Sequence, residues 1–131
     1  TLGTVAAAAK IGLKEILSDM QLNLYANKVI IDTLLGLFPE GHRCQFLVVS
    51  SGASNMAISG WTSYCTSKAA LNRMIHCYAN EYHAHHFISV CPGGVKTKMQ
   101  EAIQGLDGEA FPDLKGIQQA YPQMPSPDCN I

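Results

Sequence analysis

The chain has 131 residues, a formal net charge of −1 and 47 % hydrophobic residues. A chain of this length forms at most one domain, yet it is long enough to bury a hydrophobic core. Its nine basic and ten acidic residues form neither a basic stripe nor an acidic tail, so the charge pattern does not indicate nucleic acid as a partner. The longest apolar stretch, residues 29–38, is interrupted by Asp32 and Thr33 and is too short to span a bilayer. We therefore expect neither nucleic acid nor a membrane as a partner.

Five cysteines, an odd number, point to a reducing compartment. They form no Cys-x-x-Cys pair, and most lie in apolar or helical contexts: Cys44, Cys65, Cys77, Cys91 and Cys129. Such a pattern is typical of buried free thiols. The first residues also lack the charged and apolar regions of a secretory signal. The sequence thus predicts a cytoplasmic protein.

The first forty residues predict helices. Residues 10–17 are a short helical candidate. Ser18 and Gln21 have the spacing of a capping box, which predicts a helix from Ser18 to about Leu37, ended by Pro39-Glu40-Gly41. Its apolar residues cover more than one stripe, so we expect burial on more than one side.

Two strands separated by a helix come next. Residues 44–51 form an apolar run typical of a buried strand, and residues 52–63 predict a loop. Apolar residues at helical spacing predict a helix over 64–83, and residues 87–91 predict a second strand that Pro92-Gly93 ends. Helix, strand, helix and strand in this order favour parallel strands joined by a right-handed crossover. Because two strands alone make a marginal sheet, we expect one face or edge of it to be exposed.

The last segment, residues 105–131, contains four of the six prolines. It predicts a loop-rich or poorly ordered tail after a short helix that ends near Gln104. The sequence thus divides into a portion over 1–104 and a tail over 105–131.

The most informative pattern is Tyr64-Cys65-Thr66-Ser67-Lys68, with Ser51 thirteen residues before the tyrosine. Tyrosine and lysine four residues apart share one face of a helix. An ammonium beside a phenol favours the phenolate and lowers the tyrosine pKa from about 10. Such a tyrosine can donate or accept a proton near neutral pH. Ser51 ends a strand and Tyr64 begins the next helix, so both lie where open α/β sheets bind ligands.

These residues resemble the active site of the short-chain dehydrogenase/reductase family. The resemblance runs from about Leu22 to Gln100 and rests on four elements in family order: Leu22-Asn23, Val48-Val49-Ser50-Ser51, Tyr64-x-x-x-Lys68-Ala69-Ala70-Leu71 and Pro92-Gly93-Gly94-Val95-Lys96-Thr97. Gly60-Trp61-Thr62-Ser63-Tyr64 and Thr97-Lys98-Met99-Gln100 are most similar to the sepiapterin reductase and benzil reductase branch. The family's Gly-x-x-x-Gly-x-Gly turn and Asn-Asn-Ala-Gly segment are absent from this sequence. The resemblance therefore implies an α/β fold, partial Rossmann-like (doubly wound), with a truncated parallel sheet, as in the middle and latter half of a reductase.

The resemblance also implies roles for single residues. Tyr64 would be the general acid, Ser51 would orient the substrate oxygen, and Lys68 would lower the tyrosine pKa and bind the nicotinamide ribose. The backbone of Asn23 would hold a water that links Lys68 to solvent, although a local helix kink is an alternative explanation for this asparagine. The cofactor-binding set would be Tyr64, Lys68, Pro92, Gly93, Val95 and Thr97, and the branch favours NADP(H) over NAD(H).

The resulting hypothesis is a nicotinamide-dependent reductase of a ketone or diketone carbonyl. Its partners would be a small-molecule carbonyl substrate and a second copy, bound through the helices at 20–37 and 66–83. One alternative is a catalytically inactive fragment, lacking the phosphate-binding turn, that self-associates or binds another partner. Another is an epimerase or dehydratase of the extended family, against which the turn at 92–97 argues.

Two further features are ambiguous. Trp61 and the loop at 55–60 line an apolar substrate pocket or only pack on the following helix. His83, His85 and His86 end the predicted helix without carboxylate or cysteine partners at ligand spacing, so we expect no metal site.

Overall fold

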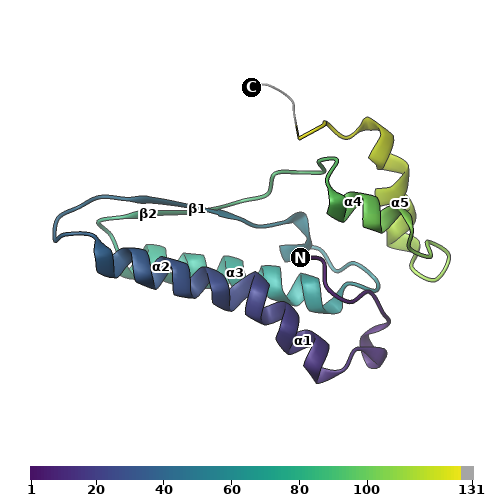
Figure 1. The fold of residues 1–131 in the computed structure, drawn as a ribbon, viewed down its shortest axis with the longest axis horizontal. Helices are drawn as coiled ribbons and strands as arrows, with labels where there is room; N and C mark the ends of the chain where they lie inside the picture. Colours follow the sequence, from purple (N-terminus) through teal and green to yellow (C-terminus); the bar gives the residue numbers. More distant parts are fainter. Residues whose placement is uncertain (128–131) are drawn as a thin grey trace.

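A parallel two-stranded sheet lies on a layer of helices (Figure 1) in the computed structural model, which describes residues 1–127. Strand β1 (Gln45–Val49) pairs with β2 (His86–Val90) so that Phe46 lies beside Phe87 and Val48 beside Ser89. Helix α3 (Thr62–Glu81) joins the two strands and lies next to α2 (Ala26–Leu37) on one face of the sheet. The α/β class and the parallel pairing that the element order predicts are both confirmed.

The long N-terminal helix is built differently from the prediction. Helix α1 (Leu13–Met20) begins after Gly12, whose backbone is extended, and a π-helical turn, Gln21–Tyr25, carries the chain into α2. The predicted capping box is wrong, because Ser18 lies inside α1 and Gln21 opens the π-helical turn. The predicted end near Leu37 is correct.

The long helix is also less buried than its apolar residues suggest. Ile31 is buried, but many apolar side chains on α1, the π-helical turn and α2 are exposed: Leu13, Leu17, Leu22, Tyr25, Val29, Ile30, Leu34 and Leu37. The expectation of burial on more than one side is therefore wrong. Within residues 1–127, α3 and the sheet cover only one side of this helix (Figure 1).

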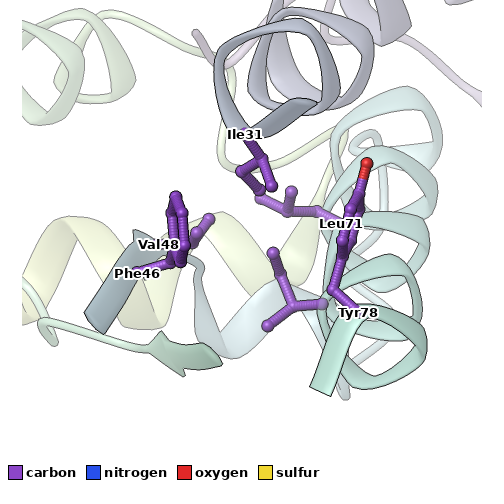
Figure 2. Close-up of a cluster of buried hydrophobic side chains, with 6 residues drawn as sticks. Ile31, Phe46, Val48, Leu71 and Tyr78 are labelled. Carbon is purple, nitrogen blue, oxygen red and sulfur yellow. The ribbon is translucent and has the colours of Figure 1, made fainter. Parts of the chain in front are cut away.

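The main core lies between β1, α2 and α3 (Figure 2). In Figure 2, Phe46 and Val48 from β1 lie on one side of the core and Leu71 and Tyr78 from α3 on the other, with Ile31 from α2 at the top of the view. Residues on a strand alternate between its faces, so Leu47 and Val49 point the other way and are 60 % and 58 % exposed. The prediction that one face of the sheet is exposed is confirmed.

A second core cluster joins the C-terminal helices to the start of α3. Ile103 on α4 (Lys98–Gln104) and Leu114 on α5 (Pro112–Ala120) are fully buried. They pack with Ala53, Trp61 and Tyr64. The sequence predicted no helix over 112–120, but Pro112 opens one and Leu114 and Ile117 give it an apolar face. Residues 128–131, with Cys129, lie outside the described part of the chain.

The described cysteines are free thiols. Cys44 and Cys65 are half-buried, whereas Cys77 and Cys91 are exposed, so the expectation of buried thiols is wrong for the latter two. Over residues 1–127, no helix combines the length and hydrophobicity that a membrane crossing requires.

Leu71→Ala should lower the free energy of unfolding by about 2–5 kcal/mol, because a fully buried leucine leaves a cavity in the main core. Leu37→Ala is the matched control, since Leu37 is 71 % exposed, and should change it by less than about 0.5 kcal/mol. Urea unfolding followed by circular dichroism measures both. Equal effects of the two substitutions would contradict the assigned core.

Candidate active site

The carboxyl ends of both strands and the first turns of α3 meet at one cleft of about 550 Å³. β1 runs into Ser50 and Ser51, and β2 runs into Cys91 and Pro92. Because parallel strands end at the same edge of a sheet, segments forty residues apart in the chain come together here. This is the edge at which α/β sheets bind their ligands.

Tyr64 lies on the first turn of α3 and lines the cleft while being only 5 % exposed. Its ring meets that of Trp61 edge to face, with 5.7 Å between the centroids. Within residues 1–127, its phenolic oxygen has no hydrogen-bond partner. The ring is thus fixed by packing while its hydroxyl stays available to a ligand.

Lys68 lies one helical turn after Tyr64 and lines the same cleft. Its Nζ donates a hydrogen bond to the carbonyl oxygen of Val49 at 3.0 Å and lies 5.9 Å from the centroid of the Tyr64 ring. Burial lowers the pKa of Lys68 below its usual range. The bond to Val49 ties the start of α3 to the end of β1.

Ser51 lines the cleft directly after β1. Its Oγ accepts a hydrogen bond from the backbone N–H of Ala53 at 3.2 Å, which caps a 3₁₀ turn at Gly52–Ser54. The Ser51 hydroxyl proton is therefore free to point into the cleft. The neighbouring Ser50 also lines it, is buried, and has an Oγ without a partner among the described residues.

Asn23 does not line the cleft but lies behind it, buried in the middle of the π-helical turn. Its Nδ2 donates to the Oγ of Ser67 at 3.1 Å and to the carbonyl oxygen of Thr1 at 3.0 Å. Ser67 in turn donates to the carbonyl oxygen of Tyr64 at 2.8 Å. Asn23 thus contacts the first turn of α3 through Ser67, and it lies in a distorted helix as the kink alternative expected.

The turn after β2 is only partly in the cleft. Pro92 and Gly93 line it, and Gly93 has a φ of 77°, a conformation that glycine adopts without strain. Val95 and Thr97 are not among the lining residues, and Thr97 precedes α4 as its N-cap. The structure thus brings together Ser51, Tyr64, Lys68, Pro92 and Gly93.

The rest of the cleft is apolar, and much of it comes from residues beyond the predicted site. Trp61 lines it, with several aliphatic and methionine side chains: Met56, Ile58, Met99, Ile117 and Met124. Gly116 and Ala120 on α5 also contribute. Of the two positions that the sequence left open for Trp61, lining a pocket or only packing on the following helix, the structure shows the first, whereas the lining residues after 104 were not predicted. The sequence feature that could have indicated the helix carrying them is Pro112 followed by Leu114 and Ile117 at helical spacing.

The histidines lie elsewhere. α3 ends at Glu81, and His85 accepts a hydrogen bond at Nδ1 from the backbone N–H of Cys44 at 3.2 Å. Among the described residues, no group of three or more His, Cys, Asp or Glu side chains is placed to hold a metal ion.

A cleft at the carboxyl ends of parallel strands, with a tyrosine and lysine one helical turn apart, defines an α/β protein of the dehydrogenase type. The family model of the short chain dehydrogenases matches residues 2–106. The chain belongs to this family, whose members use NAD(P).

Individual relatives agree with this assignment. Benzil reductase ((S)-benzoin forming) of Bacillus cereus is 30 % identical over 120 residues, which cover 86 % of this chain and 48 % of that protein. Sepiapterin reductase of Bos taurus is 31 % identical over 113 residues, which cover 84 % of this chain and 42 % of the relative. The chain thus spans about half the length of the curated relatives it matches.

A solved structure shows the same fold. The short chain dehydrogenase/reductase YIR035C of Saccharomyces cerevisiae superimposes with a TM-score of 0.84 at 29 % identity. The match covers 96 % of this chain and 51 % of the yeast protein.

The residues present fit one end of a nicotinamide cofactor. Among residues 1–127, the Lys68 ammonium has one acceptor, the carbonyl oxygen of Val49, which leaves N–H donors for ribose hydroxyls. Beside it, a Cβ built at Gly93 would meet no atom within 4 Å, so the backbone there is open to close approach. Lys68, Tyr64, Pro92 and Gly93 would therefore hold the nicotinamide and its ribose. The glycine-rich turn that binds the phosphates in this family is not in this sequence.

The pKa of Lys68 should lie below 10.5, the value of an unperturbed lysine, because burial disfavours its charged form. The unfolded state then binds more protons between the folded and unfolded pKa values, so folding stability rises as the pH rises through that window. An NMR titration of the Lys68 side chain, assigned with Lys68→Met, measures the midpoint. A midpoint at or above the value of an exposed lysine would contradict the half-buried position of Lys68.

Proposed function

We propose that the protein is an NAD(P)-dependent oxidoreductase that reduces a ketone or diketone carbonyl, with Tyr64 as the proton donor. The single observation that carries this proposal is the Tyr64 phenol, packed in the wall of the cleft and without a partner among the described residues. Ser51 and Lys68 line the same cleft. The similarity to benzil reductase and sepiapterin reductase supports a carbonyl substrate.

The proposed reaction adds two hydrogens to the carbonyl group. When bound, the reduced cofactor supplies a hydride to the carbonyl carbon. The Ser51 hydroxyl donates a hydrogen bond to the carbonyl oxygen and holds it near Tyr64. As negative charge develops on that oxygen, the Tyr64 phenol transfers its proton to it, which completes the alcohol.

Lys68 supports this step electrostatically. Its ammonium stabilises the phenolate that remains on Tyr64, while the hydrogen bond to Val49 keeps the amine in place. The backbone of Asn23 would hold a water that links Lys68 to solvent. Val95 and Thr97 would contact the cofactor from the turn after β2. NADP(H) is the proposed cofactor in preference to NAD(H), on the resemblance to the sepiapterin reductase branch.

The apolar lining suggests which carbonyl compounds fit. Methionine, isoleucine and tryptophan side chains surround the polar group of Ser51, Tyr64 and Lys68. Such a wall favours substrates with large apolar substituents over sugars or charged acids. A ketone or diketone with aromatic groups, such as benzil, is therefore the first compound to assay.

Tyr64→Phe should abolish most turnover while leaving nucleotide binding unchanged, because it removes one oxygen and keeps the ring. Turnover is measured with benzil and NADPH in a protein that joins this chain to a family nucleotide-binding half, and a loss of about 10²-fold or more is expected. Binding is measured by energy transfer from Trp61, the single tryptophan, with NADH in parallel. Retained turnover would refute Tyr64 as the acid.

The same titration on the 131-residue chain separates the alternatives. Saturable NADPH binding would support a working half-site. Absence of binding by a folded chain would favour the inactive fragment that acts through self-association or another partner.

We also propose that the chain self-associates through the exposed side of its helices at 20–37 and 66–83. Val29 and Ile30 on α2 are 64 % and 57 % exposed, and with their apolar neighbours they form a long apolar strip. The exposed residues of α3 are mostly polar, so α2 would supply the apolar contact area. The free cysteines are consistent with the cytoplasm as the proposed compartment.

Val29→Glu should convert a dimer into a monomer in sedimentation velocity, because it places an uncompensated charge within the apolar strip. Leu47→Glu is the matched control, since Leu47 is 60 % exposed on the opposite side of the sheet. A chain that is monomeric before substitution, or dimeric after Val29→Glu, would contradict the interface.

A further inference from the structure

One carboxylate holds α5 against the loop that leads into the active site. The Oδ2 of Asp113 accepts hydrogen bonds from the backbone N–H of Ser59 at 2.7 Å and from the Ser59 hydroxyl at 2.6 Å. Both bonds lower the pKa of Asp113, so its carboxylate is charged at neutral pH. Charge-assisted bonds of this kind are the stronger ones in proteins. Ser59 precedes Trp61 by two residues, so Asp113 ties α5 to the wall of the cleft.

The packing beside this contact leaves little freedom. Gly60 has a φ of 80°, and a Cβ built there would lie 2.8 Å from the Phe111 ring. At the other end of the segment, Lys96 donates to the carbonyl oxygens of Pro122 and Pro125, from Nζ at 3.0 Å and from its backbone N–H at 2.9 Å. The α5 segment is thus held at both ends across the cleft.

The part of α5 that faces the cleft is small. Gly116 and Ala120 line it, one helical turn apart, together with Ile117. A Cβ built at Gly116 would meet no atom within 4 Å, so the space next to this glycine is open. Glycine in a helix interior costs stability relative to alanine, and packing within the described chain does not require it here.

We propose that Ser59 and Asp113 form a latch that positions α5 as the substrate wall, and that Gly116 leaves the room for an aryl group of the carbonyl substrate. This rests on the proposed function, which assigns the cleft to the substrate. Met124 and Met99 line the same space, and thioethers make favourable contacts with aromatic rings. Asp113 is then a positioning residue and Gly116 a position that determines substrate size.

Gly116→Leu tests whether the space beside Gly116 accepts an aryl group. Benzil is titrated into the full chain and binding is followed by quenching of Trp61 fluorescence, which requires neither cofactor nor turnover. Leucine is a good helix former, so the fold should be kept while benzil Kd rises by about tenfold or more. Gly36→Leu is the matched control, because a Cβ at Gly36 on α2 also meets no atom within 4 Å, and it should leave Kd unchanged. No binding by the unaltered chain, or equal Kd for both variants, overturns the proposal.

Asp113→Ala and Ser59→Ala test the latch. Each should weaken benzil binding by about tenfold, and the double variant should lose little more than either, because the two residues act through one contact. In these variants, backbone amide hydrogen exchange should become faster in α5, and it should stay unchanged in α2 and in the C-terminal half of α3. Glu109→Ala is the control, since Glu109 pairs with Lys115 on the same segment at 2.6 Å without reaching the loop before Trp61. Additive losses, or an equal loss in Glu109→Ala, overturn the latch.

A failure of this proposal can be told apart from a failure of the proposed proton donor. A Tyr64→Phe enzyme with normal turnover would refute the proton donor while the benzil titrations could still succeed. Unchanged benzil binding in Gly116→Leu would refute the role of Gly116 in substrate size, and it would not affect the proposed role of Tyr64 as proton donor.

Discussion

The parallel pairing of β1 with β2 is the constraint on which the rest of the structure depends. Parallel strands need a long crossover, and α3 supplies it. Once the apolar residues of β1 and α3 bury each other, both strands must end at the same edge. Ser51 follows β1, whereas Tyr64 and Lys68 lie on α3, and the three side chains meet at this edge. The site is thus a consequence of the pairing and of where each strand stops.

Tyr64 and Lys68 are placed by opposite physical means. The Tyr64 ring belongs to the second core cluster, where Trp61, Ile103 and Leu114 fix it by packing. Lys68 is held by its hydrogen bond to the carbonyl oxygen of Val49. The partial burial of its ammonium lowers the pKa of Lys68. The phenol is thus held by packing and the ammonium by a hydrogen bond, an arrangement in line with the proposed proton donor, because preorganised groups need not move when charge develops.

Apolar side chains are exposed on two separate surfaces of this chain. Leu47 and Val49 leave one face of the sheet exposed, and Val29 and its neighbours leave the outer side of α2 exposed. The second of these surfaces is the one on which the proposed self-association depends. Residues of α5 line the cleft at the carboxyl ends of the strands, so the C-terminal segment takes part in both the second core cluster and the site.

The sequence by itself determined the two strands and the helix between them, because these follow from local periodicity, and the motif spacing indicated that Ser51, Tyr64 and Lys68 lie at one edge of the sheet. It also predicted the exposed sheet face. Only the tertiary structure decided the π-helical turn at Asn23 and the exposure of α2, because both depend on what packs against the helix. The same holds for α5: its short apolar pattern among prolines indicated a loop, and burial of Leu114 together with the Ser59–Asp113 contact makes it a wall of the cleft. Contacts between residues 54 positions apart leave no periodic signal in a sequence.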